Sequence, residues 1–306
     1  MTAPAPQPQH TPQPPAGPLA RPAQPHWPGA APFGGYTSPI PLRKAHLGDA
    51  VAAEWTKIRS LRSTMWTLGV QAVLIIGIGI LFAAAVGASD AAVTEGTTPL
   101  AYSVFGTLLG LVCVITLGVL TMSSEFGTGL VRTTFTACPD RTRVLAAKAI
   151  VYFLLVTVVT TVAVAVTGAV SVALLDGRGF AEPTGGEWLR STLGTGVFTG
   201  LVGLVALAVG TLLRHSAGAI TAMLGLVLLP MVAGAFMYAE SLMDLRQALI
   251  EYSIPYQLFS LYGSDSGSGG PGGGGPLTGW DAVWLMLAVA AAALTAACAT
   301  LTRRDA

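Results

Sequence analysis

Charged residues are scarce in this chain of 306 residues: only 10% are Asp, Glu, Lys or Arg, whereas soluble domains carry about 25%. Hydrophobic residues make up 52% of the chain. So few polar side chains cannot cover the surface of a soluble protein, whereas lipid can cover an apolar one. The composition therefore excludes a soluble cytosolic enzyme. A net charge of only +1 gives no indication of nucleic acid as a partner.

Cysteine is also rare, and the chain lacks a nucleotide-binding motif. Cys113, Cys138 and Cys298 are odd in number and far apart, so they indicate neither a disulfide framework nor a zinc site. None of the lysines follows a glycine, as the phosphate-binding loop GxxxxGK[ST] requires. We expect no catalytic, metal-binding or cofactor-binding residue on this chain.

Six long stretches contain no Asp, Glu, Lys, Arg or His. They are residues 67–88, 101–122, 149–175, 191–213, 217–239 and 282–302. About 20 apolar residues span the hydrocarbon layer of a bilayer as a helix. The sequence therefore predicts an all-α membrane protein with six transmembrane helices between residues 67 and 302.

The absence of charged residues from these stretches argues against several classes of membrane protein. Membrane proteases, metal transporters and proton-coupled carriers keep ionisable groups at depth, because a charge there is costly and is retained for a purpose. These spans offer no such group. They are typical of a pathway or a scaffold that something else moves, and a membrane enzyme is disfavoured.

Inside the spans, glycines four residues apart allow helix backbones to approach closely. Gly106 and Gly110 form one such pair, and Gly196 and Gly200 form another. We expect a packed bundle, with Pro230 kinking or breaking the fifth span.

The distribution of lysine and arginine predicts the orientation. With the N-terminus in the cytoplasm, 13 of the 16 Lys and Arg residues fall in inside segments, and only Arg178, Arg190 and Arg246 fall outside. We therefore expect both termini in the cytoplasm, the C-terminal one being residues 303–306. Residues 240–281 form an extracellular segment with a flexible glycine-rich linker.

The N-terminal residues 1–42 contain 13 of the 20 prolines. Such a segment cannot bury enough apolar surface to offset its ordering entropy, so we predict a disordered cytoplasmic tail. Its PxxP spacing leaves an SH3-type ligand as an alternative.

Two cytoplasmic segments show more structure. Residues 43–66 carry an apolar helical period beside basic residues and a tryptophan, which is typical of a helix lying in the headgroup layer. We expect Glu54 at the rim of that helix. Residues 123–148 form an inside loop. Its glycines weaken a free helix, so we expect its apolar side chains to stabilise it by docking onto a partner. The alternative for residues 43–66 is a positively charged flank that only sets the topology. The alternative for residues 123–148 is a solvated loop.

These segments resemble those of permease subunits of type 2 ATP-binding-cassette (ABC) exporters, in the form common in actinobacteria. The matching residues are Ala53-Glu-Trp-Thr-Lys-Ile-Arg-Ser-Leu-Arg-Ser-Thr64, Ser124-Glu-Phe-Gly-Thr-Gly-Leu-Val-Arg-Thr-Thr134 and Arg143-Val-Leu-Ala-Ala-Lys148. The similarity extends roughly over residues 46–304 through the six-span layout, and the proline-rich tail lies outside it.

The resemblance implies roles for both segments. The first is similar to the elbow helix of that family, with candidate residues Glu54, Trp55, Lys57, Arg59 and Arg62. The second resembles the coupling helix, which sits in a cleft of a separate ATPase subunit. Its candidate contacts to the ATPase are Glu125 and Arg132 (polar), Phe126 and Phe135 (apolar), and the flanking Arg141 and Arg143.

The family also implies the partners. Two permeases, as a homodimer or a heterodimer, pair with two ATPases that bind ATP and magnesium, and the pair exports an amphiphilic, lipid-like or drug-like cargo across the cell membrane. Short outside helices after the fifth span shield the exit, bounded here by Pro255 and Gly263. A stand-alone carrier and a non-transporting membrane partner or immunity protein are the alternatives.

The orientation is testable with epitope tags in intact cells. Tags at either terminus or within residues 123–148 should be protected from external protease, whereas a tag within residues 267–275 should be cleaved. External cleavage of a tag in 123–148 would contradict the topology.

Overall fold

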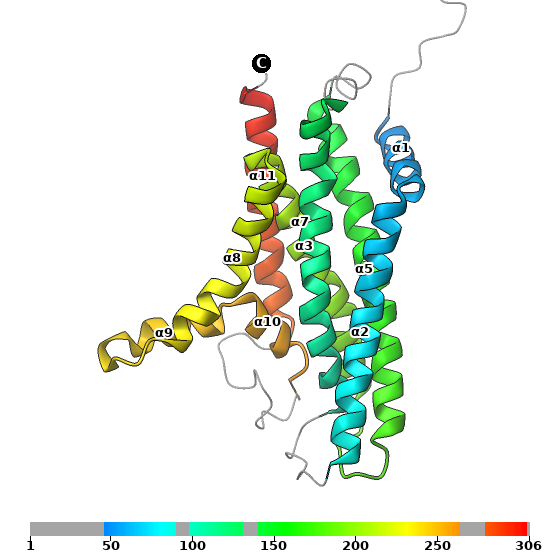
Figure 1. The fold of residues 1–306 in the computed structure, drawn as a ribbon, viewed down its shortest axis with the longest axis vertical. Coiled ribbons are helices and arrows are strands. Elements are labelled where there is room, and N and C mark those ends of the chain that lie inside the picture. Colours follow the sequence, from blue (N-terminus) through cyan, green and yellow to red (C-terminus); the bar gives the residue numbers. More distant parts are fainter. Residues whose placement is uncertain (1–45, 90–97, 131–139, 264–278, 305–306) are drawn as a thin grey trace, which may run out of the picture. The chain divides into compact units, whose positions relative to one another are not determined.

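The computed structural model describes residues 46–89, 98–130, 140–263 and 279–304, and every regular element within them is helical (Figure 1). In chain order these are α1 (Leu47–Ser60), α2 (Arg62–Ala88), η1 (Pro99–Tyr102), α3 (Ser103–Thr128), α5 (Arg141–Leu174), α6 (Gly185–Leu189), η2 (Arg190–Gly194), α7 (Thr195–Leu213), α8 (Ser216–Ala235), η3 (Glu240–Leu242), α9 (Met243–Glu251), α10 (Ile254–Ser260) and α11 (Asp281–Arg304). The predicted all-α fold is confirmed. The tail at 1–42 and the linker at 267–275 lie outside the described residues.

Within the described residues, six helical segments are long and apolar enough to cross a bilayer, as the sequence predicts. They are α2, η1 with α3, α5, the continuous run α6–η2–α7, α8 and α11. Several extend beyond the uncharged stretches, because a helix continues into the polar region where its ends meet water. α8 instead ends early, at Ala235, and Pro230 lies inside it without breaking it.

α7 lies at the centre of the bundle. It packs against α3, α5, α8 and α11, and the buried share of its span, 78%, is the highest of the six (Figure 1). Its sequence is rich in Gly, Ala and Thr, whose small side chains allow neighbours to approach from several sides.

Both predicted glycine pairs lie at close helix crossings. A Cβ atom at Gly106 would stand 2.5 Å from the backbone oxygen of Ile75 on α2, and Gly110 also faces Ile75. Gly196 and Gly200 of α7 face Thr157 of α5. At Gly106 and Gly196 the nearest atoms include backbone of the facing helix, so a side chain there would force the two helices apart.

Buried hydrogen bonds add to this packing. Gln71 of α2 donates through Nε2 to the hydroxyl of Thr160 on α5 over 2.8 Å. The hydroxyl of Tyr152, a fully buried side chain of α5, donates to the backbone oxygen of Val114 on α3 over 2.7 Å. Side-chain hydrogen bonds between membrane helices stabilise their association modestly.

The segment after the fifth span contains short helices, as expected. α10 begins at Ile254, with Pro255 in its first turn and the Ser253 hydroxyl accepting from the backbone N–H of Tyr256. Leu258 and Leu261 are fully buried, so α10 packs back into the bundle, against α3 and α11 among others. α9 contacts mainly the end of α8, and Figure 1 shows it extending away from the other helices.

The close crossing of α2 and α3 predicts that a larger residue at Gly106 lowers the stability of the protein. Gly106→Ala should lower the free energy of unfolding by about 1–3 kcal/mol, because the new methyl group meets backbone that must shift. Gly77→Ala on α2 is the matched control, since a Cβ there meets nothing within 4 Å. Denaturant unfolding in bicelles measures both, and equal stabilities of the two variants would contradict the close crossing.

Candidate functional site

α1 and α2 are two helices rather than one. Leu61, at φ −83° and ψ 104°, interrupts the helix after Ser60, and α2 begins at Arg62. The helix predicted over residues 43–66 is therefore interrupted at Leu61: α1 covers Leu47–Ser60, residues 62–66 belong to α2, and residues 43–45 lie outside the described residues. The extended residue between the two helices allows α1 to lie at an angle to the first span (Figure 1).

α1 presents two different faces. Glu54 and Ile58 are its buried residues, and α1 packs mainly on α5. The apolar stripe predicted from the sequence is divided: Ile58 packs against the bundle, whereas Trp55 and Leu47 are 49% and 42% exposed. This exposed apolar face fits a helix at a lipid surface.

Glu54 does not lie at the rim of α1, as the sequence suggested, but bonds to a lysine in the interior. The Nζ atom of Lys148, on α5, lies 2.9 Å from Glu54 Oε2 and 2.9 Å from Oε1 of Glu125, on α3. Lys57 of α1 contacts the same Glu125 oxygen. Lys148 is 0% exposed and Glu125 3%. We call Glu54, Lys57, Glu125 and Lys148 the charge cluster.

The charge cluster is balanced, with two ammonium groups and two carboxylates on three helices. A buried charge is tolerated only when it is paired and hydrogen-bonded, because removing it from water is costly. Burial and the neighbouring Lys148 ammonium lower the pKa of Lys57 from its usual value. Each of the three helices therefore supplies a charged group that pairs with one on another helix.

Two other candidate residues of the predicted coupling loop, Phe126 and Arg141, also contact the bundle. The guanidinium of Arg214 lies 5.0 Å from the ring centre of Phe126, at the end of α3. Arg141 donates to the backbone oxygen of Leu301 on α11 over 2.9 Å, and Arg143 pairs with Asp140 at the start of α5.

The predicted inside loop 123–148 is shorter than expected. α3 continues to Thr128 and α5 begins at Arg141, so most of its residues extend these two helices. Arg132 and Phe135 lie outside the described residues. Glu125, predicted to contact an ATPase, is buried against Lys148 instead of facing outward. Arg59 and Arg62 are exposed on α1 and at the start of α2.

Sequence reasoning missed Lys148 as a site residue, although it belongs to one of the quoted segments. One signal was present: Lys148 directly precedes the 27-residue uncharged stretch 149–175, where a solitary lysine needs a partner. The identity of the partners depends on helix packing, which spacing along the chain does not give.

A second polar cluster was also missed. Arg190, 8% exposed, lies in η2, a π-helical turn within the fourth span. Its Nε atom donates to the backbone oxygen of Leu261 over 3.1 Å, and its terminal nitrogen contacts the backbone oxygen of Gly263. The hydroxyls of Tyr262 and Thr195 are 3.0 Å apart. These bonds hold the residues after α10 against the fourth span.

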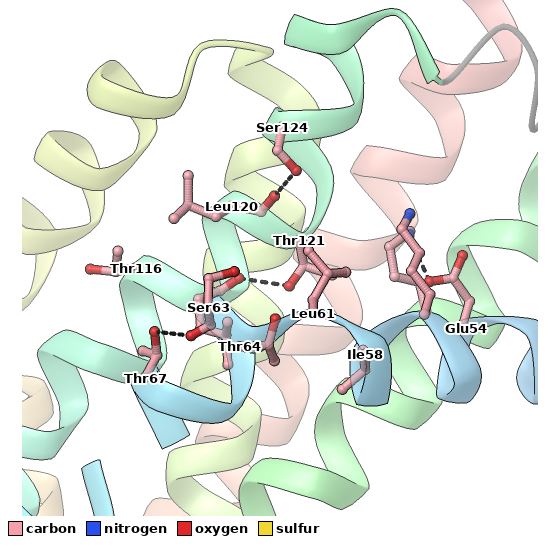
Figure 2. Close-up of a pocket in the computed structure, with 13 residues that line it drawn as sticks. Glu54, Ile58, Leu61, Ser63, Thr64, Thr67, Thr116, Leu120, Thr121 and Ser124 are labelled. Atoms are coloured by element: carbon pink, nitrogen blue, oxygen red, sulfur yellow. Dashed lines mark hydrogen bonds and ion pairs between the residues drawn. The ribbon is translucent and has the colours of Figure 1, made fainter. Parts of the chain in front are cut away.

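A cavity of about 220 Å³ lies beside the charge cluster, between α1, α2 and α3 (Figure 2). Its lining combines charged, hydroxyl and apolar side chains: Glu54, Lys57, Ile58, Leu61, Ser63, Thr64, Thr67, Thr116, Leu117, Leu120, Thr121, Ser124 and Lys148. In the part of the chain that the structure describes, no group of three His, Cys, Asp or Glu side chains is placed to hold a metal ion.

Comparison with known proteins adds no assignment: no protein-family model matches the chain, and no curated protein matches it. The interpretation of the site therefore depends on its geometry and on the sequence patterns.

The charge cluster makes a prediction about folding. Lys148→Met should lower the free energy of unfolding by about 3–5 kcal/mol, because it leaves Glu54 and Glu125 buried without their shared ammonium. The triple variant Glu54→Gln, Glu125→Gln, Lys148→Met should recover most of that loss. Arg59→Met, an exposed cation on α1, is the control. Equal stability of Lys148→Met and Arg59→Met in bicelles would refute the pairing.

Proposed function

We propose that this chain is the membrane-spanning permease subunit of an ATP-driven exporter of the type 2 ABC class. The observation that carries the proposal is the charge cluster. It bonds together α1, α3 and α5. By resemblance to that family, α1 corresponds to the elbow helix, and α3 and α5 flank the segment that resembles the coupling helix.

The geometry supports a mechanical role for this junction. Residues 129–140 connect the end of α3 to the start of α5, so a force on this segment acts on both helices. Glu125 and Lys148 bond the two helices to each other and to Glu54 of α1. The three helix ends then move as one rigid unit, while Leu61 lets α1 turn relative to α2.

The chain supplies the pathway in this proposal, and an ATPase subunit supplies the energy. ATP and magnesium bind that partner, which closes and moves the segment between α3 and α5. A second permease copy, identical or related, completes the pathway in the cell membrane. An amphiphilic, lipid-like or drug-like cargo fits spans that offer hydroxyl, glycine and apolar faces.

Co-expression with an ABC ATPase from the same genome tests the assignment of partners. A tagged wild-type chain should retain that ATPase through purification, and Arg132→Glu should weaken the retention by reversing a charge in the proposed contact. Arg178→Glu, on the segment between the third and fourth spans, is the matched control. Failure of the wild-type chain to retain any such ATPase would favour a stand-alone carrier or a non-transporting partner.

Reconstitution tests the coupling itself. In liposomes, the wild-type complex should hydrolyse ATP faster when a transported lipophilic compound is present. The triple variant that neutralises Glu54, Glu125 and Lys148 should keep ATP hydrolysis but lose most transport, because the helix ends are no longer bonded. Unchanged transport by a correctly folded triple variant would show that the cluster only stabilises the fold.

A further inference from the structure

The cavity between α1, α2 and α3 lies near the ends of two candidate spans, where lipid headgroups would meet them. It is bounded by α1, by the first turns of α2 and by the last turns of α3, so it sits at the ends of two spans. Trp55 on α1 and Trp66 at the start of α2 are 49% and 75% exposed. Exposed tryptophans gather where the hydrocarbon layer meets the headgroups.

The size of the cavity suits one part of an amphiphile. Its volume, about 220 Å³, is below the roughly 300–1,000 Å³ of pockets that enclose a drug-sized ligand. Leu61 and Leu120 line it together with the hydroxyl-bearing residues (Figure 2). A headgroup fits this space while the rest of the molecule stays outside.

Four of the six hydroxyl groups in the lining are left with acceptor capacity. Thr67, Thr116, Thr121 and Ser124 each donate to the backbone oxygen four residues earlier in their own helix (Figure 2 shows those of Thr67, Thr121 and Ser124). Since each hydroxyl has only one hydrogen, its oxygen is left to accept. A ligand with N–H or O–H donors complements such a wall, and a trimethylammonium headgroup does not.

A cation stands beside these acceptors. Lys57 lines the cavity, and 37% of its side chain is exposed although its Nζ atom contacts Glu125. An ammonium group has three hydrogens, so it can bind Glu125 and a phosphate oxygen at once. A nearby anion would also favour the charged form of Lys57, whose pKa burial and Lys148 lower.

Apolar tracks lead away from the cavity along both spans. On α2, Val70, 46% exposed, follows Ser63 and Thr67 at helical steps of four and three. On α3, Leu109 and Val112 are 49% and 44% exposed and continue the line of the cavity residues Thr116 and Leu120 at the same steps. α2 and α3 pack against each other, so the two tracks lie on neighbouring helices.

We propose that this cavity binds the headgroup of a glycerophospholipid that carries N–H or O–H donors, such as phosphatidylethanolamine or phosphatidylglycerol. Its phosphate lies beside Lys57, its headgroup donors face the hydroxyls of α2 and α3, and its acyl chains follow the tracks through Val70 and Val112. The lipid thereby fills the space beside α1 and the charge cluster. The proposal does not depend on the export function.

Native mass spectrometry of the delipidated full-length chain in detergent tests this site. Phosphatidylethanolamine, phosphatidylglycerol and phosphatidylcholine with identical acyl chains are titrated separately and in competition. The first two should bind one molecule about tenfold more tightly than phosphatidylcholine, because two or more hydrogen bonds distinguish them. Equal binding of all three lipids, which indicates annular lipid only, would overturn the proposal.

Isosteric variants locate the binding. The double variant Thr116→Val, Thr121→Val removes two acceptors while preserving shape, and should reduce the preference over phosphatidylcholine about fivefold or more. Thr295→Val is the control, because this exposed threonine on α11 makes a similar hydrogen bond to its own helix. A double variant that folds like the control and keeps the full preference would place the lipid elsewhere.

Two further measurements test separately whether binding needs the acyl chains and whether it needs the phosphate contact. Glycerophosphoethanolamine, the headgroup without acyl chains, should not displace the bound lipid even in large excess, and displacement at low excess would indicate a soluble ligand instead. Lys57→Gln should weaken all three lipids by a similar factor, because it removes the phosphate contact that they share. Unchanged affinities in that variant would exclude Lys57 as the contact.

Discussion

A single buried ammonium group, that of Lys148, holds one end of this helical bundle together. It bonds to Glu54 of α1 and Glu125 of α3 at 2.9 Å each, while Lys148 itself belongs to α5. Without Lys148, Glu54 would lose the cation to which it bonds, and Glu125 would keep only Lys57, so the burial of these carboxylates would be costly. This contact fixes α1 on the bundle, and its Lys148 and Glu54 side chains also line the cavity beside them.

The interior of the bundle is held together by close packing instead of by buried ion pairs. Its spans pack through small residues, as at Gly106 against α2 and Gly200 against α5, with isolated hydrogen bonds such as that of Gln71. Closely packed helices of this kind transmit displacement along their length because they do not deform continuously. In the proposed function, a displacement applied at the charge cluster would therefore be passed into the spans.

Polar anchoring recurs at the opposite end of the bundle, where the fourth span begins. There Arg190, in a π-helical turn, bonds to the backbone after α10, and Tyr262 bonds to Thr195. π-Helical turns are rare and are frequent at functional sites. The two ends thus share one design, in which a buried cation fixes a short element onto the long spans, one through carboxylates and the other through backbone carbonyls.

The sequence by itself determined the fold class, the number of spans and nearly all their positions, because the hydrophobic length needed to cross a bilayer is written directly in uncharged stretches such as 149–175. It also singled out Glu54, Lys57 and Glu125. Only the tertiary structure decided that these residues meet around Lys148, that Glu125 turns inward, and that α1 ends at Ser60. The physical reason is that Glu54 and Lys148 are 94 residues apart in the chain. Their contact is set by how three helices cross, and periodicity within one helix carries no information about that crossing.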